Sequence, residues 1–195
     1  MGFVTPLLCV TFCLPTAFES WDEHERRAAS LIAEARAGSP DALSALYLEH
    51  GAALFRLAYR LVGAREDAED VVHDVFVGLP EALQRYEERG RLVGWLKRVT
   101  ARVALMRLRS GKRRREVALD NAAEQAEPPR ASERDGLQAA VNTLPDHLRA
   151  VLVLKEIEGY AHGEIAELLG ISEGTSRVRL TRALKLLRHE LESGR

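Results

Sequence analysis

Residues 161–184, AHGEIAELLGISEGTSRVRLTRAL, constrain the fold of this chain more than any other segment. Ile165 and Leu169 recur at helical spacing and give the start of the segment an apolar stripe. Gly170 can adopt the left-handed backbone of a tight turn, and Ser172 can cap a second helix that begins after it. The segment therefore predicts a helix-turn-helix, a motif whose second helix enters the major groove of DNA.

The second helix of this motif has two different faces. At about 100° per residue, its core face carries Ser176, Leu180, Ala183 and Leu187. Ser176 stands where an apolar residue is usual, and we expect its hydroxyl to bond back to the backbone near the helix start. The opposite face and its flanks suit guanine edges and phosphates. The candidate DNA contacts are Thr175, Arg177, Val178, Arg179, Thr181, Arg182 and Lys185. An amphipathic hairpin with a solvated basic face is the alternative interpretation.

Charge is segregated along the chain, although the formal net charge of its 195 residues is only −1. Residues 91–115 hold ten Lys or Arg and no acid, whereas residues 64–90 hold eight acids and three Arg. A basic surface attracts phosphate and an acidic surface repels it, so these segments predict two surfaces with different partners.

The part of the chain before the helix-turn-helix also has helical periodicity. Ser39 and Pro40 suit the entry to a helix that ends at Gly63, and Pro80 is expected to break or kink the next one. Residues 116–136 lose the periodicity and contain six acids and two prolines, which is typical of a solvated linker. The predicted helices lie at residues 22–37, 41–62, 65–85 and 92–115.

This pattern contains no strand-like alternation and therefore predicts an all-α fold. We expect two helical domains, residues 21–115 and 137–195, joined by a flexible acidic linker at residues 116–136. The C-terminal domain contains the helix-turn-helix.

Residues 1–20 form an apolar N-terminal extension. Pro6 and Pro15 interrupt it, and no Lys or Arg precedes its apolar run, so a secretory signal is not favoured. Residues 1–18 are also short for a membrane span. We expect an extension that is disordered or that results from a start codon assigned too far upstream, in a cytoplasmic protein with no stable membrane insertion.

The sequence predicts no metal site, no cofactor and no catalytic residues. Cys9 and Cys13 form no disulfide framework, and no histidine lies at metal-ligand spacing with them. A phosphate-binding glycine loop and a nucleophile elbow are both missing. Asp70 and Asp74 share a helix face, but an acid-rich face is more often solvated or docked to a protein than catalytic. We therefore expect a protein that is not an enzyme.

The basic segment that follows the acidic one suits a different ligand. Its cations are interleaved with an apolar stripe, and Tyr86 and Trp95 lie close by in sequence. A cationic groove with aromatic platforms can hold unpaired bases. The alternative for Trp95 is a place in the core.

Two separated motifs resemble a known family. The first is EDAEDVVHDVFVGLPEAL, followed by Tyr86 and GRLVGWLKRVTARVALMRLRSGKRRR. The second is LPDHLRAVLVLKEIEGYAHGEIAELLGISEGTSRVRLTRAL. In this order, over about residues 41–191, they resemble bacterial RNA polymerase sigma factors of the extracytoplasmic-function (ECF) type, within the sigma-70 family. The resemblance implies a region 2-like domain at residues 21–115, which docks on the polymerase and opens the minus-ten element. It implies a region 4-like domain at residues 137–195, which reads the minus-thirty-five element.

The resemblance also implies roles for individual residues. One helix would bind the clamp helices of the largest polymerase subunit through Asp67, Glu69, Asp70, Val72, Asp74 and Phe76. A second segment would hold the melted non-template strand through Trp95, Lys97, Arg98, Arg102, Arg107 and Arg109. In the helix-turn-helix, the major-groove readers would be Arg177, Val178, Thr181 and Arg182. The implied partners are core RNA polymerase, promoter DNA and an anti-sigma factor.

Two other classes of protein stay open at this point. A conventional helix-turn-helix activator or repressor would use residues 22–115 as an effector or dimerisation domain, but it leaves the basic segment without a task. A structural helical interaction protein would explain the acidic face but not the arginine-rich second helix. A repressor would bind a palindrome as a dimer, whereas a sigma factor would bind core polymerase.

Overall fold

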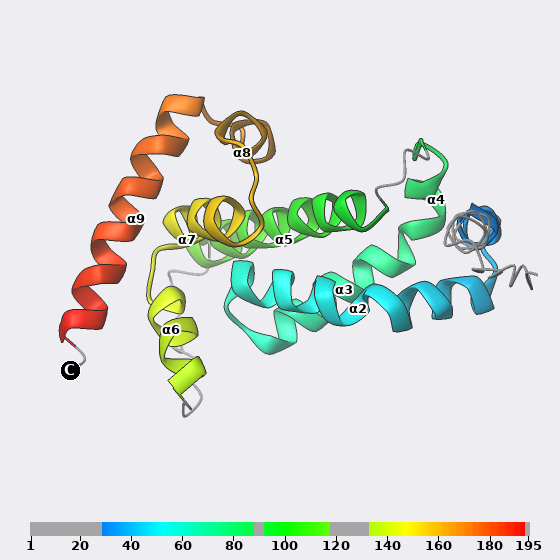
Figure 1. The fold of residues 1–195 in the computed structure, drawn as a ribbon, viewed down its shortest axis with the longest axis horizontal. Helices are drawn as coiled ribbons and strands as arrows, with labels where there is room; N and C mark the ends of the chain where they lie inside the picture. The colour runs from blue at the N-terminus through cyan, green and yellow to red at the C-terminus, as the bar shows by residue number, and fades with distance from the viewer. Residues whose placement is uncertain (1–28, 88–91, 118–132, 194–195) are drawn as a thin grey trace, which may run out of the picture.

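The computed structural model describes residues 29–87, 92–117 and 133–193, and within these ranges the regular structure is helical throughout, with no strand (Figure 1). The side chains of residues 112–117 and 133–136 lie outside this description, as do residues 1–20 and most of the predicted linker. A first helix covers residues 29–36. It is followed by α2 (Pro40–Val62), α3 (Arg65–Val77), α4 (Leu79–Leu83), α5 (Leu92–Val117), α6 (Glu133–Asn142), α7 (Asp146–Leu152), a π-helical turn η1 (Val153–Ile157), α8 (His162–Leu169) and α9 (Glu173–Ser193).

The bounds of α2 follow from its flanking residues, as the sequence predicts. The hydroxyl of Ser39 accepts a hydrogen bond from the Ala42 N–H at 3.4 Å, and Pro40 occupies the first turn, where a backbone donor is not needed. At the other end, Gly63 has φ 83°, which a side chain would disfavour, and its N–H donates to the Tyr59 carbonyl at 2.8 Å.

The helix predicted over residues 65–85 is divided into two. The break falls at Gly78, between α3 and α4, rather than at Pro80 itself. Pro80 lies in the first turn of α4, where its missing N–H has no partner to lose, so it begins the short helix instead of kinking a long one. α5 begins at Leu92, as predicted.

The predicted linker is shorter than residues 116–136. α5 extends through Val117 and α6 begins at Glu133, so both helices take residues from the ends of that range.

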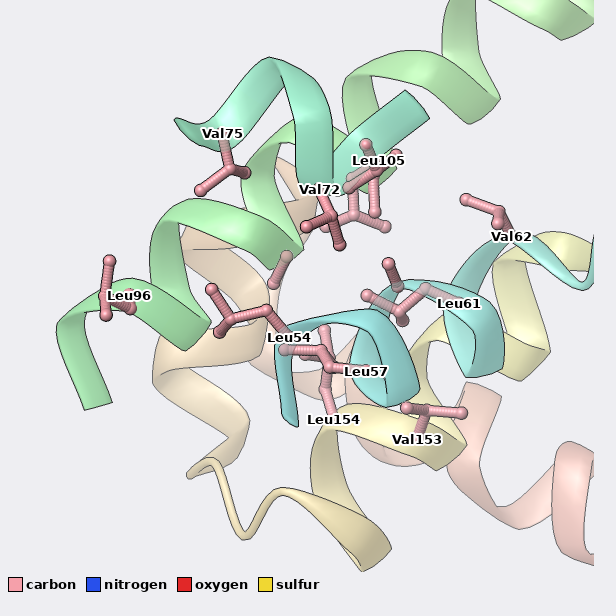
Figure 2. Close-up of a cluster of buried hydrophobic side chains, with 14 of the residues drawn as sticks. Leu54, Leu57, Leu61, Val62, Val72, Val75, Leu96, Leu105, Val153 and Leu154 are labelled. Carbon is pink, nitrogen blue, oxygen red and sulfur yellow. The ribbon is translucent and has the colours of Figure 1, made fainter. Parts of the chain in front are cut away.

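The helices from residue 29 to α5, here called the first half, share a core with the helices from α6 to α9, the second half. Leu54 and Leu57 of α2 are fully buried, and so are Val153 and Leu154 of the second half. Figure 2 shows these four side chains in one cluster. α2 contacts α6 and α7, and α5 contacts α8. The two halves are therefore packed against each other rather than held apart.

α9 lies at the edge of the molecule, beyond α6 and α7 (Figure 1). It contacts α6, α7 and α8 and buries Ala183, while much of its length faces solvent. Within the described residues, no helix is both long and apolar enough to span a membrane.

Candidate nucleic-acid interface

The helix-turn-helix is formed by α8, a turn at Gly170 and α9, as the sequence predicts. Gly170 adopts the left-handed conformation with φ 65°, and its N–H donates to the Ala166 carbonyl. The hydroxyl of Ser172 accepts a hydrogen bond from the Thr175 N–H at 3.1 Å and so caps α9. These local contacts fix the angle at which α9 leaves the turn.

The outward face of α9 is available to a ligand. Val178, Thr181, Arg182 and Lys185 are exposed, whereas Thr175 and Arg179 are half-buried. The guanidinium of Arg177 is ion-paired with Glu173 one turn earlier. The side chains of Arg179, Arg182 and Lys185 make no hydrogen bond or ion pair with the described part of the chain. This face therefore carries three cations that have no partner among the described residues, and two of them, Arg182 and Lys185, are exposed.

Ser176 faces the core, as predicted, but its hydrogen bond is not the expected one. It is fully buried, and its hydroxyl lies 2.9 Å from Nδ1 of His162 at the start of α8. The prediction of a bond back to the helix backbone is therefore wrong. A side chain on the facing helix satisfies the buried hydroxyl and links the two helices of the motif.

The acidic face of α3 points outward. Glu66, Glu69, Asp70 and Asp74 are exposed, and Asp67 is half-exposed. Two of the candidate polymerase contacts differ from these. Val72 is buried in the core, so its side chain is not part of the exposed surface, and Phe76 is half-buried in an edge-to-face contact with Tyr47, with ring centroids 5.0 Å apart. At a position three or four residues from other core residues, an apolar side chain on an amphipathic helix turns inward.

Exposed apolar side chains occur on α3 and on α2, which packs against it, and the sequence pattern did not single them out. Val77 at the end of α3 is 67% exposed, and Tyr47 and Leu48 on α2 are 53% and 82% exposed. These apolar residues occupy positions that their helices turn toward solvent. The sequence reveals them only once it is known which side of each helix faces the core. They are further candidates for a protein contact.

Arg107 lies against the acidic face rather than beside the other cations of α5. Its Nε donates to Asp67 at 2.8 Å, its Nη2 is ion-paired with Asp70, and its Nη1 lies 4.0 Å from Asp74. The hydrogen bond to Asp67 raises the pKa of Arg107, and burial partly opposes that rise. The residue therefore fixes α5 to α3.

Three other candidate strand contacts on α5 are occupied by the second half. The Lys97 ammonium lies 2.8 Å from a carboxylate oxygen of Glu158, and Arg98 is ion-paired with Glu164. Arg109 donates to the Leu169 carbonyl at 3.0 Å. Arg102, by contrast, is exposed and has no partner within the described residues.

Trp95 is half-buried and packs against Tyr86, with ring centroids 4.9 Å apart and planes inclined by 49°. The indole is therefore neither an interior core residue nor a free platform. Among the described residues, no group of three His, Cys, Asp or Glu side chains is arranged to hold a metal ion.

Two separate parts of the chain match models of known protein families. Residues 46–114 match the family model described as Sigma-70 region 2, and residues 134–187 match the model described as Sigma-70, region 4. The ECF RNA polymerase sigma factor SigE of Mycolicibacterium smegmatis is 37% identical over 155 residues, covering 75% of this chain and 60% of that protein. SigM of Mycobacterium tuberculosis is 30% identical over 161 residues, covering 82% of each chain.

Solved structures share the fold. The sigma factor RpoE of Bartonella quintana, in complex with the anti-sigma factor NepR, superposes with a TM-score of 0.59 at 22% identity, covering 78% of this chain and 98% of that one. CnrH, in complex with the cytosolic domain of CnrY, gives a TM-score of 0.52 at 26% identity, covering 84% of this chain and 96% of that one.

A region 2 followed by a region 4 defines the class of the sigma-70-type sigma factors, which are regulatory subunits of RNA polymerase and not enzymes. The chain belongs to the ECF group of this family. Its function is to direct promoter-specific transcription initiation.

Proposed function

We propose that the two halves of this sigma factor divide promoter recognition between them. In this proposal residues 21–115 dock on core RNA polymerase and open the minus-ten element, residues 116–136 connect the halves, and residues 137–195 read the minus-thirty-five element. The observation that carries the proposal is the exposed basic face of α9, whose Arg182 and Lys185 have no partner in the described part of the chain.

Recognition of the upstream element uses the outward face of α9. Arg182 donates in a bidentate manner to a guanine edge, and Val178 and Thr181 offer an apolar surface and a methyl group to thymine methyls. Arg179 and Lys185 bind phosphates and set the position of the helix in the groove. Arg177 exchanges its ion pair with Glu173 for a contact to DNA, and Thr175 supports the helix start through Ser172.

Docking on the polymerase uses the acidic face of α3. Asp67, Glu69, Asp70 and Asp74 attract a basic surface, and this face repels DNA until a protein covers it. Phe76, packed against Tyr47, forms part of the apolar border of the surface that contacts the polymerase. Val72 acts from inside the core by supporting the helix.

Capture of the melted strand uses α5. Lys97, Arg98, Arg102 and Arg109 attract the sugar-phosphate backbone, and the half-buried Trp95, held by the buried Tyr86, offers the exposed part of its indole to an unpaired base. Arg107 keeps α5 in place through Asp67 and Asp70.

The proposed partners are core RNA polymerase, promoter DNA and an anti-sigma factor. RpoE was solved in complex with the anti-sigma factor NepR, and we expect a partner of this class for the present chain. We further propose that the protein acts in the cytoplasm, where its polymerase and promoters are.

Association with core polymerase tests this function against that of a conventional regulator. We expect the purified chain to join core polymerase in a one-to-one complex that forms on size-exclusion chromatography and binds promoter DNA. A chain that stays apart from core polymerase and binds a palindromic duplex as a dimer would instead be a helix-turn-helix regulator.

A further inference from the structure

The first helix, residues 29–36, precedes the segment that matches Sigma-70 region 2, and none of its residues has a role in the proposed function. Ile32 anchors this helix in the core, where its side chain is only 3% exposed. The helix ends at Arg36, whose side chain is half-buried. A half-buried arginine at the end of a helix needs partners for its donors, and the fold supplies them from a distant part of the chain.

The guanidinium of Arg36 holds the backbone at the end of α4. Its Nε donates to the Leu83 carbonyl at 3.0 Å, and its Nη2 donates to the Tyr86 carbonyl at 3.1 Å. Leu83 is the last residue of α4, a helix of only five residues, and the final carbonyls of a helix lack intrahelical donors. A planar guanidinium can reach two such carbonyls at once, whereas an ammonium group does not offer the same fixed pair of donors.

A second side chain makes the contact reciprocal. Gln84, in the turn that follows α4, donates from its side-chain amide to the Arg36 carbonyl at 2.9 Å. This carbonyl lies at the C-terminal end of the first helix, where it also lacks an intrahelical donor. The end of the first helix and the end of α4 therefore satisfy each other's backbone groups.

Tyr86 connects this junction to α5. Its carbonyl is held by Arg36, and its buried ring packs against Trp95 with ring centroids 4.9 Å apart. Because buried side chains are closely packed, a shift of the Tyr86 backbone displaces the ring that lies against the indole. The position of Trp95 thus depends on a backbone contact made by the first helix.

We propose that Arg36 is a positioning residue for promoter opening: through the backbone of Tyr86 it fixes the indole of Trp95 where an unpaired base can contact it. This inference rests on the proposed function, which assigns Trp95 to the melted strand. Groups that bind a ligand must be held within about 0.5 Å of the productive geometry, and the contacts of Arg36 supply this support.

The fluorescence of Trp95 reports its surroundings directly. Trp21 and Trp95 are the two tryptophans of the chain, so Trp21→Phe leaves Trp95 as the single reporter in the full-length protein. In this background, Arg36→Ala should shift the emission to longer wavelength and increase quenching by acrylamide, because the indole becomes more exposed. Arg36→Lys keeps the charge but not the planar pair of donors and should give an intermediate result. Unchanged emission and quenching in Arg36→Ala would overturn the inference.

Promoter opening by the complex with core polymerase measures the consequence for function. Arg36→Ala should reduce the permanganate reactivity of unpaired thymines on a duplex promoter by about threefold to tenfold, which corresponds to the net contribution of about one hydrogen bond. Arg36→Lys should recover part of this loss. Wild-type reactivity in a folded Arg36→Ala variant would overturn the inference.

Ile32→Val is the matched control. It changes the same helix and lowers stability by removing one buried methylene group, but it leaves the contacts of Arg36 in place. Both variants are compared at a temperature at which circular dichroism shows that they are fully folded. Ile32→Val should open the promoter like wild type. Equal losses of opening in Ile32→Val and Arg36→Ala would overturn the inference, because Arg36 would then only support the fold.

Trp95→Leu shows whether Arg36 acts through the indole. This variant keeps an apolar side chain against Tyr86 and removes the aromatic surface. Adding Arg36→Ala to Trp95→Leu should cause no further loss of opening, because residues that act through one another give non-additive effects. If the two fold-losses multiply in the double variant, Arg36 acts by a separate route and the inference is overturned.

The same variants separate this inference from the proposed function. If Trp95→Leu reduces opening and Arg36→Ala does not, the inference fails and the role of Trp95 in strand capture stands. If Trp95→Leu opens the promoter like wild type, Trp95 has no role in strand capture and the inference fails with it. A shifted Trp95 emission, reduced opening in Arg36→Ala and wild-type opening in Ile32→Val together support the inference.

Discussion

Arginines of the same formal charge have different tasks in this molecule because their surroundings differ. Arg149 is buried and donates to helix-end carbonyls, and desolvation lowers its pKa while Asp146 opposes the decrease. Arg107 is held by Asp67 and Asp70. Arg182 is exposed and unpaired within the described part of the chain, so it can bind a ligand without first giving up a protein partner.

Arg182→Ala tests base recognition at the residue scale. If this guanidinium donates to a guanine, the variant should lose about 1–3 kcal/mol of discrimination between the preferred upstream sequence and its point mutants. Competition binding by the polymerase complex measures that difference. Arg188→Ala, at an exposed position further along α9, is the control and should keep the discrimination. If the variant loses the same amount of affinity on every upstream sequence, Arg182 contacts only a phosphate.

At the scale of elements, the sequence predicted the helix ends that depend on contacts between neighbouring residues. Ser39, Gly63, Gly170 and Ser172 stop or start helices through contacts within a few residues, and the structure confirms all four positions. Contacts between residues far apart in the sequence could not be predicted from these local patterns. Periodicity showed that Ser176 faces the core but could not show that His162 meets it, because the partner depends on how α8 and α9 are packed.

The same limit applies to the candidate site. Charge and spacing identified the cations of α5 and the acids of α3, but a one-dimensional pattern does not reveal which opposite charges approach each other. Arg107 was therefore grouped with the strand contacts, whereas the fold directs it to Asp67 on α3. The family resemblance suggested Val72 as a polymerase contact, but its side chain is buried in the core.

Asp70→Asn tests the acidic face of α3. The variant removes one charge and keeps the size of the side chain, and Asp67 still holds Arg107 at 2.8 Å. Affinity for core polymerase should fall by about 1.5–3 kcal/mol if Asp70 accepts a charge-assisted hydrogen bond there. Fluorescence titration measures the affinity, circular dichroism checks the fold, and Glu167→Gln is the charge control. Unchanged affinity in a folded variant would place the docking surface elsewhere.

Arg98→Ala and Arg102→Ala test strand capture by α5. Each should reduce open-complex formation on duplex promoters but have a much smaller effect on a template already unpaired around the minus-ten element. The premelted template removes an unpairing cost of a few kcal/mol that the cations otherwise help to offset. Permanganate reactivity of unpaired thymines reports opening. Equal losses on both templates, together with a lower melting temperature, would mean that these arginines only support the fold.

At the scale of the whole molecule, the two halves form one packed unit in the free chain. Val153 and Leu154 of the second half are buried in the same cluster as Leu57 of the first (Figure 2). Arg149 of the second half donates to carbonyls at the end of α2, and Arg109 of the first half donates to a carbonyl at the end of α8. Such an interface makes the stability of each half depend on the other.

Arg149→Ala tests this dependence. The variant leaves the carbonyls of Leu61 and Val62 without their donor, so the free energy of unfolding should fall by about 1–3 kcal/mol. Urea denaturation followed by circular dichroism measures the loss. Arg149→Lys keeps the charge without the planar fork and should lose less. The exposed Arg188→Ala control should stay within about 0.5 kcal/mol of wild type. A wild-type denaturation curve for Arg149→Ala would show that the cap does not stabilise the interface.

Transcription of genomic DNA fragments by core polymerase from the same organism, with and without the purified chain, tests the central claim most directly. Mapping of RNA 5′ ends should reveal discrete start sites that require the chain and share two common upstream elements, one near minus ten and one near minus thirty-five. Start sites that are the same with and without the chain, or that lack a shared pair of elements, would contradict the assignment of this protein as a promoter-directing sigma factor.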